Sequence, residues 1–174
     1  MKGIVIYKGK YGSTKLYAEW IGEKLNLPTI SSDEINGKQL TKYDFLILGS
    51  AVYIGKLLLQ KWIKKNLASL HNKKLFLFSV SATPPDKAEI LQGYIESSVP
   101  SEIRNKMEIY FFPGRLRIKS LSWFDHFMLK MGSLLEKNTE AKAGMLKERD
   151  GMQKENLDEL ESSVSRFCKM PVCF

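Results

Sequence analysis

Short, nearly continuous apolar runs recur along the chain from its amino terminus to about residue 112. They are rich in β-branched and aromatic side chains and lie at Ile4–Tyr7, Tyr43–Leu48, Leu75–Val80 and Met107–Phe112, with a weaker run at Pro28–Ser32. Runs of this length are typical of strands that are buried on both faces of a sheet. Such a sheet needs helices on both of its faces.

Apolar residues at helical spacing fill the intervals between these runs. They predict helices from Thr14 to Leu25, over Lys56–Leu70 and over Asp86–Ser98. Strands that alternate with helices of this length imply right-handed crossovers and a parallel sheet. The sequence therefore predicts a three-layer, doubly wound α/β fold with five parallel strands.

The pattern changes after Gly114. Ser120–Leu135 is an aromatic-rich amphipathic stretch, 137–151 is polar and carries no motif that we can assign, and Glu155–Met170 predicts a closing helix. We expect a single domain over residues 1–174, with an aromatic and basic insertion at about 114–137.

Composition excludes several classes of protein. With 174 residues, of which 44% are hydrophobic, the chain has enough apolar side chains for a core, which excludes a disordered or disulfide-dependent chain. Cys168 and Cys173 read as ordinary thiols, and with His71 and His126 they match no metal-ligand spacing. No apolar run reaches membrane-spanning length, so we expect a cytoplasmic protein.

The first strand leads into its helix through Lys8, Gly9, Lys10, Tyr11, Gly12, Ser13 and Thr14. Two glycines, two hydroxyls and the free amides of a helix amino terminus predict a phosphate site. The residue after Gly12 is not lysine, the loop has no cysteine, and Lys8 stands where a receiver domain needs carboxylates. These features exclude a nucleotide-triphosphate P-loop, a low-molecular-weight phosphatase and a phosphoacceptor domain. A plain glycine-containing turn remains the alternative.

Two further loops leave neighbouring strands of the predicted sheet. One contains Ser50, Ala51, Val52, Tyr53, Ile54 and Gly55, and the other contains Ser81, Ala82, Thr83 and Pro84. Ligands of open parallel sheets bind outside the carboxyl ends of the strands. Small residues beside Tyr53 and Ile54 suit a planar ring, with the third loop along its opposite edge. The alternative is that Tyr53 packs between helix and sheet.

Together these loops resemble those of the flavodoxin superfamily. The resemblance implies strand order 2-1-3-4-5 and one flavin mononucleotide (FMN), with its phosphate on the first loop and its ring between the other two. Lys8 and Gly9 stand where that superfamily places hydroxyl residues. We therefore hypothesise that Lys8 or Lys10 contacts the phosphate, because an ammonium can replace a lost hydroxyl bond.

A second resemblance lies beyond the sheet. The segments Gly114-Arg115-Leu116-Arg117 and 123–130 resemble the insertion of the menaquinone-dependent protoporphyrinogen oxidases. This resemblance implies an FMN-dependent oxidoreductase that passes electrons from a reduced, porphyrinogen-like substrate to a quinone. A flavodoxin-type electron-transfer protein without its own substrate is the alternative, and a domain that binds no flavin is a third.

Residues 115–137 carry five basic and two acidic side chains around an apolar stripe. The segment predicts either peripheral contact with the inner membrane face or a helix packed on the protein's own core. The net charge of +8, with Lys8, Lys10 and Lys56 near the loops, predicts a higher reduction potential than that of acidic carriers.

Two further expectations concern nucleic acid and catalysis. The basic residues are dispersed and form no nucleic-acid module, so we expect no nucleic-acid partner. Asp125 and His126 are proton-transfer candidates by residue type only, because adjacent helix positions do not face each other.

Overall fold

The computed structural model describes residues 1–118, 121–123, 125–127, 130–131 and 148–169. The strands are β1 (Gly3–Lys8), β2 (Thr29–Ser31), β3 (Phe45–Tyr53), β4 (Lys56–Leu57), β5 (Lys74–Ser81), β6 (Met107–Pro113), β7 (Arg115–Leu116) and β8 (Arg149–Asp150). The α-helices are α1 (Ser13–Leu25), α2 (Gln60–Lys65), α3 (Leu67–Leu70), α4 (Ala88–Ser98), α5 (Ser101–Arg104) and α8 (Asp158–Lys169), and 3₁₀ turns cover η1 (Gly37–Lys42) and η3 (Lys154–Leu157).

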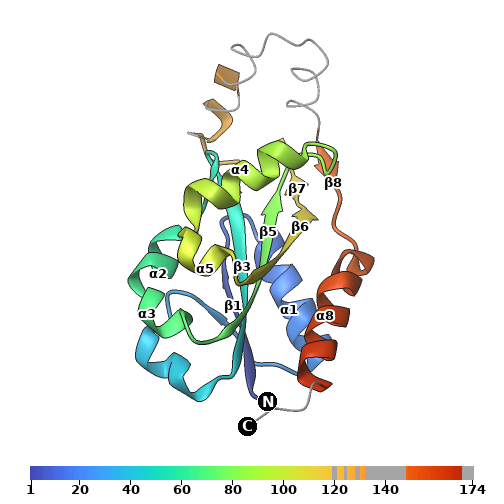
Figure 1. Cartoon of the computed structure of the whole chain (residues 1–174). Coiled ribbons are helices and arrows are strands. Elements are labelled where there is room, and N and C mark those ends of the chain that lie inside the picture. The colour runs from blue at the N-terminus through green and yellow to red at the C-terminus, as the bar shows by residue number, and fades with distance from the viewer. Residues whose placement is uncertain (119–120, 124, 128–129, 132–147, 170–174) are drawn as a thin grey trace.

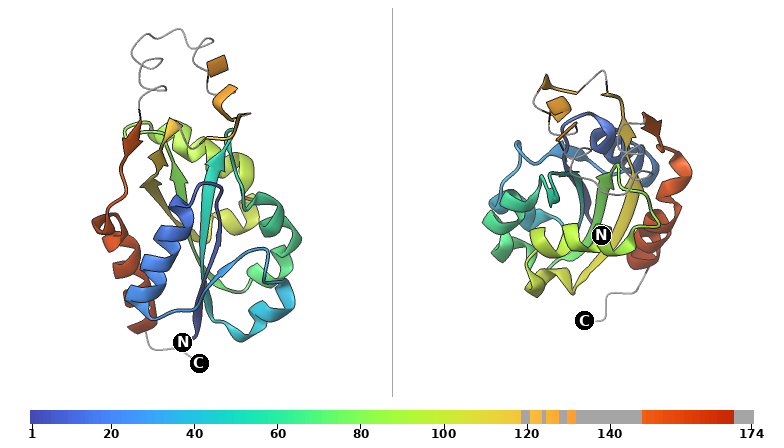
Figure 2. Two further views of the ribbon diagram at one scale, coloured as in Figure 1. Left: turned by 180° about the vertical axis from the view of Figure 1, so that it is seen from behind. Right: turned by 90° about the horizontal axis from the view of Figure 1, so that it is seen from above.

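The main sheet has the order β2-β1-β3-β5-β6, and all of these strands run parallel. The short β4 pairs antiparallel with the end of β3 and lies off this path. When β4 is left out of the numbering, the order is 2-1-3-4-5, so the predicted doubly wound α/β fold with five parallel strands is confirmed. Helices α1 and α8 cover one face, and α2 to α5 cover the other (Figures 1 and 2).

Successive residues of the central strands enter different cores, because side chains alternate across a strand. Ile4, Ile6 and Leu48 face the side of α2 to α5, where they pack in a cluster with Ile63 and Ile95. On the other face, apolar residues of α1 and α8 pack against the alternate residues of the sheet. The helices contribute Tyr17, Ile21, Leu160 and Val164, and the sheet contributes Val5, Ile47, Phe76 and Phe78. Burial on both faces explains why the strands read as continuous apolar runs.

The predicted helix over Lys56–Leu70 is wrong at both its start and its middle. Ile54 and Gly55 have φ of 48° and 70°, and these left-handed conformations turn the chain back so that Val52 and Tyr53 pair with Leu57 and Lys56. Asn66 separates α2 from α3, with its side-chain amide donating to Trp62 O at 2.8 Å. An asparagine that bonds to the backbone in this way competes with helix continuation.

The other boundaries differ less from the prediction. Helix α4 begins at Ala88 rather than at Asp86, and α8 begins at Asp158 because Lys154–Leu157 forms a 3₁₀ turn. Half of the predicted amphipathic stretch Ser120–Leu135 lies outside the described residues. So do residues 137–147, whereas Arg149 and Asp150 form β8.

Candidate functional site

The three predicted loops leave adjacent strands at the same end of the sheet. Ser50 is paired in register with Lys8 on one side and with Ser79 on the other, so the carboxyl ends of β1, β3 and β5 lie next to one another. In Figure 1 this is the upper end of the sheet, where the chain also leaves toward β7 and returns through β8.

The first loop ends in an open helix amino terminus. Gly12 takes a left-handed conformation with φ of 89°, no side chain caps α1, and the first turn contains no acidic residue. The first intrahelical bond runs from Leu16 N to Gly12 O at 2.9 Å, so the amides of Ser13, Thr14 and Lys15 have no acceptor within the helix. Partial positive charge gathers at such an end, and an anion is the ligand that suits it.

Gly9 is required where the first loop is most compact. A Cβ atom built there would lie 2.9 Å from the Cβ of Thr14, a side chain that is only 1% exposed. Any larger residue would push the loop away from the helix amino terminus. The loop therefore keeps the backbone close to the place where an anion would bind.

Ser13 is oriented by a residue far away in sequence. Its Oγ accepts a hydrogen bond from the backbone N–H of Arg115 at 3.3 Å. A hydroxyl carries one proton and two lone pairs, so this contact uses an acceptor position and leaves the proton able to donate. Arg115 thus prepares Ser13 as a donor at the α1 amino terminus.

The two lysines of the first loop have carboxylate partners. Lys8 Nζ lies 2.6 Å from Asp33 Oδ1, because the parallel pairing of β1 with β2 brings the residues after β2 beside Lys8. Lys10 Nζ lies 2.6 Å from Asp125 Oδ2 and 4.0 Å from the centroid of the Tyr53 ring. The hypothesis that one of them contacts a phosphate stays a prediction, and each ammonium would have to leave its carboxylate or share it.

Asp125 joins the first loop to the second. Its side chain is buried at 7% exposure and accepts hydrogen bonds from the hydroxyls of Tyr11 and Tyr53 as well as from Lys10. Partial burial works against a charged Lys10, but the bonds to Asp125 and Tyr53 outweigh it and raise the pKa of Lys10. The sequence indicated Asp125 only as a proton-transfer candidate by residue type, and the structure buries this carboxylate among three donors.

The second loop is a tight hairpin whose tip faces solvent. Ile54 is 61% exposed, and Tyr53 is half-buried, with its hydroxyl on Asp125. Two successive residues with positive φ define the hairpin turn that matches strand twist. Ser50 has a structural role instead, because its buried Oγ accepts from Leu59 N at 3.1 Å and donates to Ala51 O at 3.0 Å.

The third loop is held by its neighbours. Ser81 Oγ accepts from Thr83 N at 3.2 Å, and Thr83 Oγ1 lies 3.1 Å from the hydroxyl of Tyr94. Arg149 donates to Ala82 O at 3.2 Å, which ties this loop to β8. Ala82 and Pro84 are exposed and can contact a ligand.

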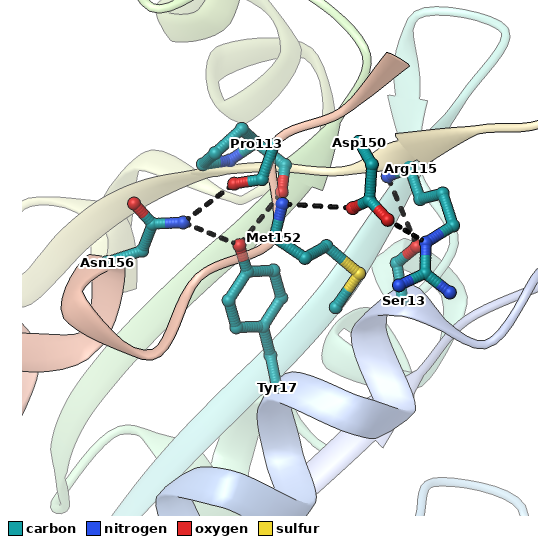
Figure 3. Close-up of polar contacts among 8 residues, drawn as sticks. Ser13, Tyr17, Pro113, Arg115, Asp150, Met152 and Asn156 are labelled. Carbon is teal, nitrogen blue, oxygen red and sulfur yellow. Dashed lines mark hydrogen bonds and ion pairs between the residues drawn. The ribbon is translucent and has the colours of Figure 1, made fainter. Parts of the chain in front are cut away.

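A two-stranded stem connects the segment after β6 with the first loop. Arg115 and Leu116 of β7 pair antiparallel with Asp150 and Arg149 of β8. Figure 3 shows the polar network beneath this stem, in which the Tyr17 hydroxyl donates to Pro113 O at 2.9 Å and accepts from Asn156 Nδ2 at 2.8 Å. No signal in the sequence predicts these contacts between α1, β6 and the turn before α8.

The strand order and the three adjoining loops define a flavodoxin-like α/β protein. Residues 4–142 match the flavodoxin domain family, and the chain belongs to it. An uncharacterised protein of Methanocaldococcus jannaschii is 29% identical over 111 residues, which cover 62% of this chain and 67% of that protein. The protoporphyrinogen IX dehydrogenase [quinone] of Escherichia coli K12 is 21% identical over 141 residues, or 75% of this chain and 78% of the enzyme.

Two solved flavodoxins are also similar to this chain. A flavodoxin from the domain Archaea is 23% identical and covers 65% of this chain and 85% of its own, with a TM-score of 0.45. Two-electron reduced Megasphaera elsdenii flavodoxin is 13% identical over 63% of this chain and 82% of its own, with a TM-score of 0.47. In the part of the chain that the structure describes, no helix combines the length and apolarity that crossing a membrane requires.

Proposed function

We propose that the three loops bind FMN, with its phosphate at the amino terminus of α1 and its ring between the second and third loops. Members of the flavodoxin family typically bind FMN. The observation that carries the proposal is the uncapped first turn of α1, which has no acidic residue and follows a left-handed Gly12. The amides of Ser13, Thr14 and Lys15 and the Ser13 hydroxyl supply donors of the kind that a phosphate monoester needs.

Each loop has a separate task in this proposal. Gly9 to Thr14 hold the phosphate, Tyr53 and Ile54 cover one face of the ring, and Ala82 to Pro84 border its opposite edge. FMN supplies hydride and one-electron chemistry, whereas the protein supplies binding, orientation and electrostatics. We assign no proton-transfer residue, because Asp125 is engaged by three donors.

FMN titration of the purified protein tests the proposal. Flavin fluorescence should be quenched on binding, and Ser13→Ala should weaken binding by about 10–100-fold, because one charge-assisted hydrogen bond is lost. Ser101→Ala, which changes an exposed serine at the start of α5, is the matched control and should bind FMN like the unchanged protein. Unchanged fluorescence on titration of the unchanged protein would refute FMN binding.

We further propose that the FMN protein is an oxidoreductase that passes electrons from a reduced, porphyrinogen-like substrate to a quinone. The similarity to the E. coli quinone-dependent enzyme supports this reading at 21% identity. A flavodoxin-type electron carrier is the second candidate. Anaerobic reduction followed by mixing with a menaquinone analogue separates them, since an oxidase is reoxidised rapidly by the quinone and a carrier only by a redox protein.

An apolar surface supports peripheral contact with a membrane, the compartment of such quinones. Trp123 is 83% exposed and stacks on Phe127, with ring centroids 6.2 Å apart, and Met131 is also exposed. Exposed aromatic residues beside basic ones suit the interface of anionic lipids. Co-sedimentation with anionic vesicles, lost in Trp123→Ser, is the expected result for a cytoplasmic protein that binds the inner membrane face.

Two of the lysines that are expected to raise the reduction potential of bound FMN are paired with carboxylates. Lys8 and Lys10 are paired with Asp33 and Asp125, which reduces their contribution to the local field. The net charge of +8 and the exposed Lys56 remain. We therefore still propose that the reduction potential of the bound FMN lies above that of acidic flavodoxins, and potentiometry of the FMN protein measures this potential.

A further inference from the structure

The cluster around Asp125 has the chemistry of a carboxylate receptor. One ammonium, from Lys10, and two phenol hydroxyls, from Tyr11 and Tyr53, converge on a single carboxylate. Charge-assisted hydrogen bonds of this kind are stronger than neutral ones. The donors stand on the first and second loops, so their convergence is built into the carboxyl edge of the sheet.

The occupant of this receptor comes from outside the doubly wound core. Asp125 lies beyond β7, in the segment that leaves the sheet through the β7–β8 stem. Its neighbours cover little of the protein, because Trp123 is 83% and Phe127 49% exposed. Two hydrogen bonds between described residues hold this part of the segment: Asp125 N donates to Ser122 Oγ at 3.2 Å, and Ser122 N donates to the Tyr11 hydroxyl at 3.2 Å. Withdrawal of Asp125 would therefore change little in the exposure of Trp123 and Phe127.

We infer that Lys10, Tyr11 and Tyr53 form a binding site for an organic carboxylate, which Asp125 fills in the free protein and from which a ligand's carboxylate displaces it. The inference goes beyond the proposed function and does not require FMN. It assigns the protein a ligand with at least one carboxylate, bound by residues of the first and second loops, which are also the loops proposed for the flavin.

The donor set favours a carboxylate over a phosphate. Tyr53 bonds to Asp125 Oδ1, and Tyr11 and Lys10 bond to Oδ2, so two oxygens take up three donors. One carboxylate balances the single charge of the Lys10 ammonium, whereas a phosphate dianion would leave one negative charge without a cation in this set. The α1 amino terminus, with several free amides, is better suited to a phosphate.

Chemical rescue in the FMN-free protein tests the inference. Asp125→Ala removes the carboxylate from the receptor. In 0.2 M sodium acetate the melting temperature of this variant should then lie about 2–4 °C above its value in sodium chloride of equal ionic strength. The unchanged protein should not respond, because its own carboxylate fills the site. Asp86→Ala, which removes an exposed aspartate from the third-loop region, is the matched control and should not respond either.

Two further measurements test which anion the receptor prefers and whether Lys10 is part of it. Sodium phosphate at equal ionic strength should rescue Asp125→Ala less than acetate does, and Lys10→Met/Asp125→Ala should lose the response. Asp125→Ser, which also leaves room for acetate, replaces Asp125→Ala if that variant does not fold. The inference is overturned if acetate acts no better than chloride on the emptied receptor, if it raises all variants equally, or if phosphate rescues better. Failure of FMN to bind would refute the proposed function and leave this result unaffected.

Discussion

Arg115 Nε lies 2.6 Å from Asp150 Oδ2, and this ion pair joins the two strands of the β7–β8 stem (Figure 3). The same Arg115 uses its backbone N–H to hold Ser13 at the amino terminus of α1. The stem and the proposed phosphate site therefore share one residue. A change in the stem should reach the first loop through Arg115.

Asp150→Asn tests the stem. Burial opposes an ionised Asp150, but the bonds from Met152 N–H and Arg115 outweigh it and lower the pKa of the carboxyl. The charge therefore stabilises the fold above the ordinary aspartate range, and this contribution is lost as the pH falls through the lowered pKa. Because Asp150 is 45% exposed, solvent screening limits the loss in the variant to about 1 kcal/mol or less.

Hydrogen exchange gives the more sensitive measurement of this variant. Peptides covering 113–118 and 148–152 should exchange faster in Asp150→Asn, whereas the central strands should not change. Asp158→Asn removes an exposed aspartate that lies 3.8 Å from Lys24 and serves as the control. Equal exchange in all three proteins would show that the ion pair does not hold the stem.

Tyr17→Phe removes a buried hydroxyl from beneath the stem. The Tyr17 hydroxyl donates to Pro113 O and accepts from Asn156, in a side chain that is fully buried. The variant leaves these partners one hydrogen bond short, so its free energy of unfolding should fall by about 1–3 kcal/mol. Urea unfolding measures the change. Tyr43→Phe is the control, because the Tyr43 hydroxyl makes no hydrogen bond among the described residues, and a loss no larger than that of the control would contradict the prediction.

The sheet was predictable because burial on both faces leaves a strong signal in the sequence. Val5 and Ile6 enter opposite cores, yet both must be apolar, and the same holds along β3 and β5. The position of the candidate site was predicted from a general rule, that ligands bind outside the carboxyl ends of parallel strands. Gly9 and Gly12 were informative because one is needed for close approach and the other for positive φ.

The contacts that organise the site were not predictable from local patterns. Asp125 meets Tyr11 and Tyr53 across separations of 114 and 72 residues, and helical spacing says nothing about such pairs. The strand β4 was missed for another reason. Its Leu57 continues an apolar spacing that fits a helix, and the turn that prevents the helix uses an isoleucine, Ile54, in a conformation that favours glycine.

Ile54→Asn tests whether this turn is strained for a functional reason. A β-branched residue at φ of 48° is unfavourable, and asparagine before glycine is the preferred pair for such hairpins. The variant should gain about 1 kcal/mol in stability, since Ile54 is 61% exposed and little buried surface is lost. If Ile54 covers the flavin ring as proposed, FMN binding should weaken at the same time.

Ile90→Asn is the control for Ile54→Asn. Ile90 is 48% exposed, lies in α4 and has no positive φ, so its replacement should lower stability slightly and leave FMN binding unchanged. Thermal unfolding and FMN titration of both variants give the comparison. A loss of stability in Ile54→Asn equal to that of the control would contradict strain at the hairpin.

Tyr110→Phe should remove part of the alkaline instability of the fold. Burial raises the pKa of Tyr110 from 10.0 to about 12, and the neighbouring Glu108, which accepts its hydroxyl proton at 3.0 Å, adds to the effect. Since the unfolded chain releases this proton first, the folded state loses stability as the pH rises from 10 toward 12. Between pH 9 and pH 11 the free energy of unfolding of the unchanged protein should fall by about 1–1.5 kcal/mol more than that of Tyr110→Phe.

Urea unfolding at the two pH values measures this difference, and lysine deprotonation, which is common to both proteins, cancels in it. Tyr43→Phe should lose as much as the unchanged protein; if Tyr110→Phe did the same, burial of the Tyr110 hydroxyl would not account for the alkaline loss.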